Sequence, residues 1–305
     1  MMKYLTIDIG GTFVKHSLID ENHKLTQTDK FSTPGSMDDF LTAIKNLISR
    51  YGNEISGVCI ACPGQVDART GYLFKGGLIS YLKNFPLASC LSKECQLPVS
   101  VINDANAAGL AEAKYGNLVG SQLGAALVLG TGVGLALVSN GELLSFKNFE
   151  RGALFAKAKT DQTDKKELFT LRKKGVASLI ENSGSAVQFI HRASNLLGLP
   201  QEDGKEVFKI LASKTNPDLT TEFENYCREI AYLILNLQKI FNLDRVIIGG
   251  GISQQKILIE EINRQHHLLL KTTLSESVQN FSIKAGKFHN DANLIGAYCH
   301  FKELG

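Results

Sequence analysis

The sequence predicts an α/β protein of two domains, and three observations support this prediction. The chain has 305 residues, and domains of about 100–200 residues are typical, so its length fits two of them. Segments with the two-residue period of strands alternate with segments of helical period. A strand, a glycine-rich turn and a second strand occur twice, at residues 4–19 and 124–138, which predicts two halves of like topology.

The elements of the first half justify the α/β class in order. Residues 4–9 and 13–19 alternate and are rich in β-branched side chains, so they are predicted as a hairpin around the turn at 10–12. Residues 36–51 carry apolar side chains at helical spacing and start with a capping-type serine. The remaining predicted elements are strands at 57–61 and 99–102 and helices at 87–95 and 105–115.

The second half repeats the start of the first and then becomes mostly helical. Residues 125–129 and 135–138 are predicted strands on either side of a second glycine-rich turn. Residues 222–241 form an amphipathic helix, and a strand at 245–248 leads through three glycines into a helix from residue 253.

The division between the two domains is predicted in the polar, glycine-containing segment 115–123. The first domain would comprise residues 1–118, with a C-terminal helix at 291–305 returning to it. The second, larger domain would comprise residues 119–290.

Composition and charge exclude several classes of protein. With 44% hydrophobic residues, 28 Gly and 6 Pro, the chain is neither disordered nor collagen-like. Its net charge of +3 is spread along the chain, so a nucleic-acid partner is not expected. No segment reaches the roughly 18 apolar residues of a membrane span and no signal peptide is found, so no membrane partner is expected. Six cysteines in mostly apolar surroundings fit a reducing, cytoplasmic location.

Two glycine-rich turns are candidate phosphate-binding loops. Gly10-Gly11-Thr12 and residues 130–134 each join two predicted strands, and glycine lets backbone N–H groups approach an anion closely. Each turn alone is equally explained as a hairpin turn. No P-loop motif occurs, and the second turn leads into a strand where a dinucleotide fingerprint requires a helix. Gly249-Gly250-Gly251 does join a strand to a helix, where amides can meet a phosphate.

Two aspartates are candidates for chemistry. Asp8 lies at the end of the first predicted strand, beside the glycines, where a carboxylate can bind Mg²⁺ near phosphates or simply cap the turn. Asp104 lies between a strand and a helix, as either an N-cap or a general base. The tetrapeptide Asn103-Asp104-Ala105-Asn106 recurs at residues 290–293, where it is interpreted as a helix start. The tetrapeptide therefore does not identify a base by itself. The pair Cys59 and Cys62 and the histidines lack partners at metal-ligand spacing.

Five motifs in order resemble those of the ROK family of sugar kinases, over residues 3–140 and again over 245–298. They are Asp8-Ile9-Gly10-Gly11-Thr12 with Lys15, Pro63-Gly64 with Asp67, Asn103-Asp104-Ala105-Asn106, Gly130-Thr131-Gly132-Val133-Gly134 and Gly249-Gly250-Gly251-Ile252-Ser253.

The resemblance implies a two-lobed actin-like ATPase fold of the hexokinase type, related to ribonuclease H, with ATP, Mg²⁺ and a sugar between the lobes. It implies that Asp104 takes the proton from the sugar hydroxyl and that Asp8 acts on Mg²⁺ indirectly. The implied nucleotide residues are Asp8, Gly10, Gly11, Thr12, Lys15, Thr131, Gly132, Gly250 and Gly251. The implied sugar residues are Pro63, Gly64, Gly77, Asn103, Asp104 and Glu150. The resemblance also implies a homodimer.

The middle of the chain departs from the family pattern. Many members have a Glu-x-Gly-His sugar motif and a cysteine-rich zinc loop, whereas residues 140–190 contain neither Cys nor His, so no structural zinc is expected. The trace of the sugar motif is Glu150-Arg151-Gly152, with Ala153 where the His would fall. These departures, and Gly76-Gly77 in the sugar loop, are similar to the β-glucoside kinases of the family.

The expected function is therefore ATP-dependent phosphorylation of a sugar hydroxyl, the 6-hydroxyl of a β-glucoside or hexose. N-acetylmannosamine kinase and glucokinase remain alternatives, and so does a non-catalytic sugar sensor with the same fold. The strand-turn-strand context of the glycines excludes a NAD-dependent oxidoreductase.

Overall fold

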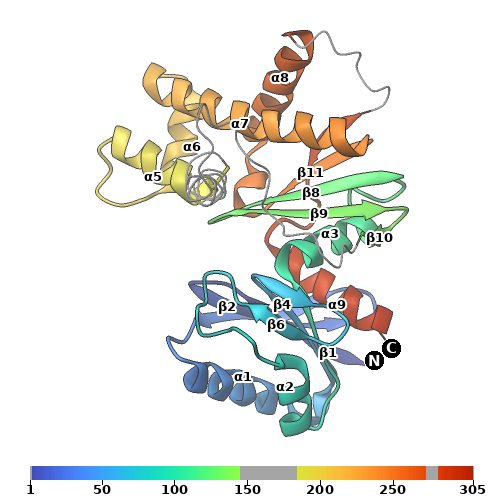
Figure 1. The fold of residues 1–305 in the computed structure, drawn as a ribbon. Coiled ribbons are helices and arrows are strands. Elements are labelled where there is room, and N and C mark those ends of the chain that lie inside the picture. Colours follow the sequence, from blue (N-terminus) through green and yellow to red (C-terminus); the bar gives the residue numbers. More distant parts are fainter. Residues whose placement is uncertain (1, 145–183, 273–280, 305) are drawn as a thin grey trace, which may run out of the picture. The chain divides into compact units, whose positions relative to one another are not determined.

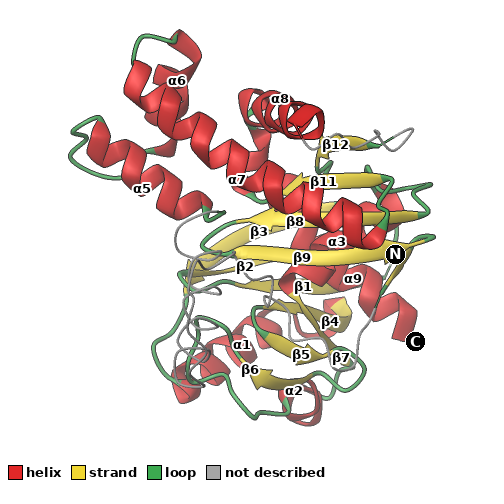
Figure 2. Ribbon diagram, turned by 45° about the horizontal axis from the view of Figure 1, so that its top comes forward, coloured by secondary structure: helices red, strands yellow, loops and turns green. Residues whose placement is uncertain are grey.

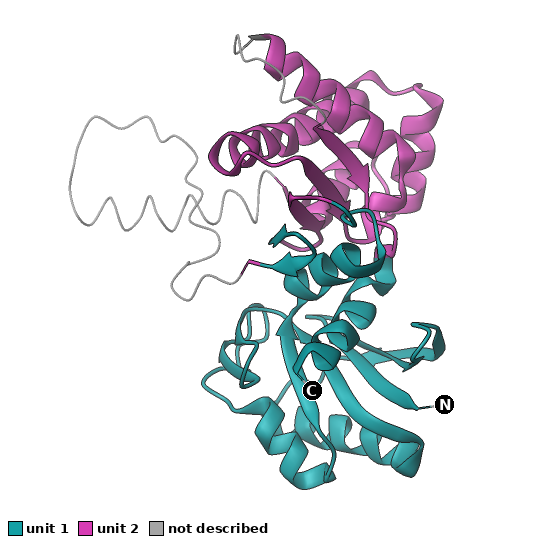
Figure 3. Cartoon of the chain, turned by 90° about the vertical axis from the view of Figure 1, so that its right-hand side faces the viewer, with its two compact units in different colours: residues 1–120, 136–143, 290–305 teal, residues 121–135, 144–289 magenta. Residues whose placement is uncertain are grey.

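The computed structural model describes residues 2–144, 184–272 and 281–304 (Figure 1). The chain divides into two compact units (Figure 3). The first comprises residues 1–120, 136–143 and 290–305, and the second comprises residues 121–135 and 144–289. Residues 136–143, which the sequence assigned to the second domain, group with the first unit.

The first sheet contains five strands in the order β3-β2-β1-β4-β7. Strands β1, β2 and β3 form an antiparallel meander, and β1, β4 and β7 run parallel. Short turns join the antiparallel strands, while the parallel ones need longer crossovers, which contain the helices. The bounds are β1 (Lys3–Ile9), β2 (Phe13–Asp20), β3 (Leu25–Ser32), β4 (Ile55–Cys62) and β7 (Val99–Asn103).

Helix α1 (Met37–Tyr51) and the first sheet enclose one apolar core. Ser36 caps α1, its Oγ accepting a hydrogen bond of 3.2 Å from the backbone N–H of Asp39, and Phe40 and Ile44 are fully buried against the sheet. The other elements near this core are the 3₁₀ turn η1 (Gly52–Glu54), α2 (Leu87–Cys95) and a two-stranded sheet of β5 (Gln65–Asp67) and β6 (Tyr72–Lys75). Helical and strand predictions for this half are confirmed.

Helices α3 (Asp104–Tyr115) and α9 (Ala292–Leu304) cross in close contact in the first unit. A Cβ placed on Gly296 would lie 1.7 Å from the backbone oxygen of Ala107. Only glycine allows the two backbones to approach this closely. The C-terminal helix is thereby fixed against the helix that begins at Asp104.

The second sheet repeats the order of the first, as β10-β9-β8-β11-β12. Strand β10 pairs antiparallel with β9, and β11 runs parallel to both β8 and β12. The predicted recurrence is therefore confirmed. The bounds are β8 (Leu123–Leu129), β9 (Val133–Ser139), β10 (Glu142–Leu143), β11 (Arg245–Gly249) and β12 (Ser282–Ala285).

The second unit is mostly helical, and its helices α7 and α8 pack against each other (Figure 2). Helix α7 begins five residues earlier than the sequence predicts, because Asn216 caps it and Pro217 occupies its first position, where no N–H is needed. Phe189 and Tyr226 stack at 4.6 Å and fill the space between α5 and α7. The bounds are α5 (Ala186–Leu196), α6 (Gly204–Ser213), α7 (Pro217–Phe241), η3 (Gly251–Gln254), α8 (Lys256–Thr272) and η4 (His289–Asp291).

None of the helices in the described ranges combines the length and the apolar character needed to cross a bilayer.

Candidate functional site

Polar side chains of the first unit gather where its parallel strands end. Asp8 on β1 lies opposite Ala61 on β4, and Ala61 lies opposite Ile102 on β7. Asn103 and Asp104 follow directly at the end of β7. Ligands of open α/β sheets bind outside the carboxyl ends of the strands, so this edge is the candidate site.

Asp104 is oriented by two hydrogen-bond donors. Its Oδ1 accepts from Asn103 Nδ2 at 2.9 Å and from the backbone N–H of Ala105 at 2.8 Å. Asn103, rather than Asp104, caps helix α3, since its Oδ1 accepts from the backbone N–H of Asn106 at 3.1 Å. The alternative that Asp104 is the N-cap is therefore wrong.

The predicted sugar loop lies beside Asn103. Asn103 Nδ2 donates to the backbone oxygen of Gly64 at 2.9 Å. Gly64 has a φ of 91°, and a Cβ there would lie 2.1 Å from the Lys75 backbone oxygen and 2.4 Å from the Gly77 nitrogen. The structure thus brings Pro63, Gly64 and Gly77 together with Asn103. The last predicted sugar residue, Glu150, lies outside the described residues, as does Ala153.

The first glycine-rich turn presents exposed backbone to a ligand. Gly11 and Thr12 are exposed, and the turn is closed by hydrogen bonds from the Gly10 N–H to the Phe13 oxygen at 2.9 Å and from Thr33 Oγ1 to the Gly10 oxygen at 2.6 Å. Such a turn can offer amides to a phosphate.

Asp8 has the electrostatic environment of a cation-binding carboxylate. Its pKa is raised to about 6, mainly by burial and also by the nearby charge of Asp104, while the hydrogen bond from Asn293 and the charge of Lys15 act in the opposite direction. Burial, together with the charges of Asp104 and Asp8, also raises the pKa of the Cys62 thiol. Two carboxylates that destabilise each other's charge are stabilised by a divalent cation, and carboxylate oxygens are ligands that Mg²⁺ prefers. The residues therefore fit Mg²⁺, held by Asp8 directly or through water.

Residues that the sequence interpreted only as a helix start also reach this site. Within the segment 290–293, the first two residues belong to the short turn η4 and Ala292 begins α9, so the expected helix start is present. In addition, Lys15 Nζ forms an ion pair with Asp291 Oδ1 at 2.6 Å and donates to the Asn290 oxygen at 3.0 Å. Asn293 Nδ2 donates to Asp8 Oδ1 at 3.1 Å. In the sequence, only the recurrence of Asn-Asp-Ala-Asn pointed to these residues. Contacts between residues some 280 positions apart cannot be derived from motif spacing.

The second unit supplies backbone turns with no carboxylate at the equivalent place. The turn after β8 is closed by the Gly130 N–H, which donates to the Gly132 oxygen at 3.0 Å, and Thr131 is exposed. Gly250 has a φ of 86°, and a Cβ there would lie 2.1 Å from the Leu129 oxygen. The turns holding Thr131, Gly132 and Gly250 are therefore neighbours within this unit. Gly251 begins η3, next to Gly250.

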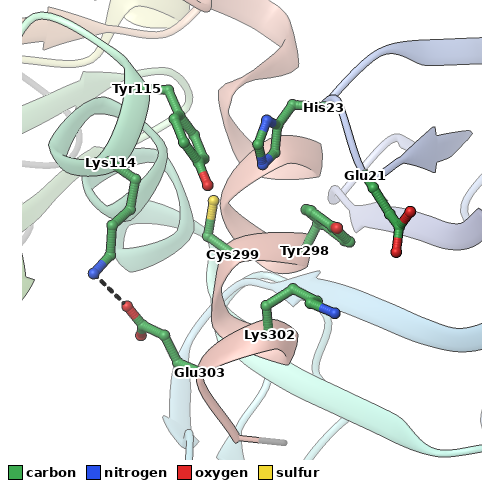
Figure 4. A pocket seen from close by; sticks show the side chains of 8 residues that line it. All are labelled: Glu21, His23, Lys114, Tyr115, Tyr298, Cys299, Lys302 and Glu303. Carbon is green, nitrogen blue, oxygen red and sulfur yellow. Dashed lines mark ion pairs between the residues drawn. The ribbon is translucent and has the colours of Figure 1, made fainter.

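A pocket of about 430 Å³ lies elsewhere in the first unit, between the ends of α3 and α9 (Figure 4). The rings of His23 and Tyr115 face each other at 4.0 Å in it, and an ion pair joins Lys114 to Glu303. None of the predicted site residues lines it. This pocket is therefore separate from the candidate site.

The ROK family profile matches residues 4–149 and 178–303 of the chain. The chain belongs to the ROK family. A β-glucoside kinase of Listeria monocytogenes is 30% identical over 307 residues, covering 98% of this chain and 97% of the relative. A solved ROK family protein from Streptococcus pneumoniae, in complex with sucrose, has a TM-score of 0.80 at 26% identity and covers 99% of this chain and 98% of its own.

A further ROK structure supports the fold. A glucokinase from Streptomyces griseus, in complex with glucose and AMPPNP, has a TM-score of 0.77 at 21% identity, with 97% of both chains covered. At this identity the comparison shows the fold. The two-lobed actin-like ATPase fold expected from the sequence is confirmed.

Proposed function

We propose that this ROK protein is an ATP-dependent kinase that phosphorylates the 6-hydroxyl of a β-glucoside, with Asp104 as the general base. The arrangement of Asp104 carries the proposal. Its carboxylate is oriented by Asn103 and the Ala105 N–H at the strand edge that also bears Asp8.

Asp104 would accept the proton of the sugar hydroxyl as the hydroxyl oxygen forms a bond to the γ-phosphorus of ATP. The bond from that phosphorus to the oxygen bridging to the β-phosphate would break, and ADP would leave. The Asn103 amide and the Ala105 N–H both donate to Oδ1, which orients the carboxylate. Asn103 uses its amide N–H groups on Gly64 and Asp104, so it links the sugar loop to the base. Asn103 thus both orients the base and contributes to the sugar site.

The remaining residues would bind and orient the nucleotide. When bound, Mg²⁺ would neutralise phosphate charge, and Asp8 is the residue that would hold it. The amides of Gly10, Gly11 and Thr12, the ammonium of Lys15, and Thr131 with Gly132 would contact phosphates. Gly250 and Gly251 would lie near the adenosine, where the lack of side chains admits a flat base. Phosphoryl transfer depends mainly on such positioning and charge neutralisation.

The substrate class rests on the relatives and on the sugar loop. The relative at 30% identity is a β-glucoside kinase, and Ala153 replaces the family's sugar-binding His. A site that lacks a hydrogen-bonding pair for the hydroxyls next to C1 discriminates less against a substituent there. Gly77 at a φ of 60°, packed on Pro63 and Gly64, adds no side chain to the loop.

The test is ADP release with Mg-ATP across glucose, N-acetylmannosamine, fructose, cellobiose and aryl β-glucosides. We expect kcat/KM for cellobiose or an aryl β-glucoside to exceed that for N-acetylmannosamine. The opposite ranking would assign the chain to the N-acetylmannosamine or hexose kinases, and sugar binding without ADP release from any of them would assign it to the sugar sensors. The family resemblance also supports a homodimer, which sedimentation tests. The six cysteines in mostly apolar surroundings support a cytoplasmic location, which cell fractionation tests.

A further inference from the structure

The segment 290–293 contacts the two charged residues that flank the first glycine-rich turn. Asp291 and the Asn290 oxygen bind the Lys15 ammonium, and the Asn293 amide binds the Asp8 carboxylate. An ammonium has three N–H donors, and these contacts use two of them. The third can meet a phosphate oxygen without breaking either contact.

This segment is fixed in place by the packing of α9. Its Gly296 lies against the backbone of Ala107 in α3, and Tyr298 packs on Tyr4 of β1 with ring centroids 5.2 Å apart. Ala292 and Leu294, on either side of Asn293, are buried. The packing of α9 in the core therefore determines where the side chains of Asp291 and Asn293 lie.

Lys15 has an alternative partner that the ion pair with Asp291 opposes. Lys15 and Asp8 are direct cross-strand partners in β2 and β1. Side chains at such positions are close enough for an ion pair. A Lys15 ammonium that turned onto Asp8 would occupy the carboxylate that is available for Mg²⁺, whereas the pair with Asp291 draws it away.

Asn293 complements this arrangement because it is neutral. Its amide N–H orients Asp8 through Oδ1 without adding a positive charge. A lysine at this position would neutralise Asp8, and an aspartate would repel it.

We propose that Asp291 and Asn293 are positioning residues of this kinase: Asp291 holds Lys15 toward the phosphates and away from Asp8, and Asn293 orients Asp8 toward Mg²⁺. This inference rests on the proposed function. The tetrapeptide Asn-Asp-Ala-Asn occurs twice in the chain, and the first copy contains the proposed base Asp104. The proposal assigns a role to the second copy, at residues 290–293.

The test compares Asp291→Asn and Asn293→Ala with Glu303→Gln. Glu303 lies at the other end of α9, where it pairs with Lys114 (Figure 4), so its change also removes one α9 contact but leaves the site intact. Calorimetry measures the affinity for Mg²⁺ with ADP, and kinetics measure the KM values for Mg-ATP and for the sugar. Removing a residue that orients a metal ligand typically costs about 10–100-fold in affinity, so we expect a loss near the lower figure.

The two site variants should weaken Mg²⁺-ADP binding and raise the KM for Mg-ATP, with the KM for the sugar unchanged. Glu303→Gln should change none of the three. Asn293→Asp should weaken Mg²⁺-ADP binding differently from Asn293→Ala, because it replaces the donor with a carboxylate. Equal effects of all variants, or equal effects on nucleotide and sugar, would mean a merely structural role and would overturn the proposal.

A double-mutant cycle isolates the pair of Lys15 and Asp291. In the Lys15→Gln background no ammonium remains to occupy Asp8, so Asp291→Asn should no longer weaken Mg²⁺-ADP binding. An undiminished effect would contradict the role assigned to Asp291. If wild-type protein turns over no sugar, the proposed function fails, while the nucleotide-binding comparison still decides the positioning role.

Discussion

The two five-stranded sheets share one strand order, but the turns at their first hairpins differ in chemistry. In the first sheet Asp8 and Lys15 flank the turn at residues 10–12. At the same positions of the second hairpin, the next-to-last residue of its first strand and the third residue of its second, lie Val128 and Leu135. The repeat therefore preserves the backbone and not the charges.

The glycines after the fourth strand of each sheet show what is preserved. Gly64 and Gly250 have φ values of 91° and 86°, and a Cβ at either would lie 2.1 Å from a backbone oxygen. One backbone conformation thus recurs in two turns, and among the described residues the carboxylates Asp8 and Asp104 lie at the strand ends of the first unit. This difference predicts that the turn of Gly64 in the first unit serves the sugar and that the turn of Gly250 in the second serves the nucleotide.

Removal of the metal should have the largest effect. Activity should vanish with EDTA and return with Mg²⁺, because Asp8 would bind a cation that neutralises phosphate charge. The melting temperature should remain nearly unchanged, since the core of the first unit is apolar and independent of the cation. Stoichiometric zinc in metal-free buffer, found by elemental analysis, would contradict the expectation that no structural zinc is present. Residues 145–183, which include the segment of the family's zinc loop, lie outside the described ranges.

Asp104→Asn should have the next largest effect, confined to kcat. The amide keeps hydrogen-bonding capacity but cannot accept the hydroxyl proton, and loss of a general base typically costs about 10²–10⁴ in rate. Sugar affinity, measured by calorimetry, should remain close to that of the wild type. Asp203→Asn is the matched control, because Asp203 caps α6 in the second unit and its change should affect stability and not turnover. A kcat near that of the wild type for Asp104→Asn would refute the base assignment.

The two constrained glycines allow the sides of the site to be separated. Gly64→Ala should raise mainly the KM for the sugar and Gly250→Ala mainly that for ATP, because each Cβ meets a backbone oxygen of its own unit. Displacement of a binding group by about 1 Å can cost about 10²-fold in rate, and the strained φ should cost about 1–3 kcal/mol of stability.

Gly249→Ala is the control for the second change. A Cβ on Gly249 would lie 3.4 Å from the nearest atom, Val128 Cγ2, and this side-chain methyl can give way. Gly249→Ala should therefore leave the KM for ATP within a small factor of the wild-type value. If Gly64→Ala and Gly250→Ala raised the same KM, the assignment of the two units to two ligands would fail.

Most of the framework of the site could be predicted from the sequence, because local patterns determine it. Alternating apolar residues predict β1 and β2, and the glycines between them require a turn. The recurrence of this unit predicts the second sheet. The sequence also places Asp104 at the junction of a strand and a helix.

Contacts distant along the chain could not be predicted in this way. The choice between Asn103 and Asp104 as N-cap depends on one backbone conformation, since Asn103 is extended and Asp104 is already helical. The pairs of Lys15 with Asp291 and Asp8 with Asn293 depend on how α9 packs against α3. No local periodicity determines the N-cap or these two pairs. The repeated tetrapeptide Asn-Asp-Ala-Asn indicates only that residues 290–293 deserve comparison with residues 103–106.

The smallest expected effect concerns two of the buried histidines, one chosen from each unit. His300 Nε2 donates to the Ala68 oxygen at 2.9 Å, and burial lowers its pKa despite this bond. His266 lies 3.1 Å from Gln238 Oε1, and burial together with His267 lowers its pKa. Both histidines are therefore neutral in the folded protein at a pH where the unfolded chain, with its ordinary pKa near 6.5, begins to bind protons.

Stability should thus be greatest above about pH 6.5 and fall as the pH drops through that value toward the lowered pKa of the folded state. His300→Gln and His266→Gln, which keep an amide donor, should each flatten the decline in melting temperature between pH 7 and pH 5. We expect differences of a few degrees, since about 1 kcal/mol corresponds to roughly 2–4 °C for domains of about 150–250 residues. If only one variant flattens the decline in melting temperature, the unit that contains its histidine is the first to unfold in acid. Identical slopes for wild type and both variants would show that neither histidine contributes.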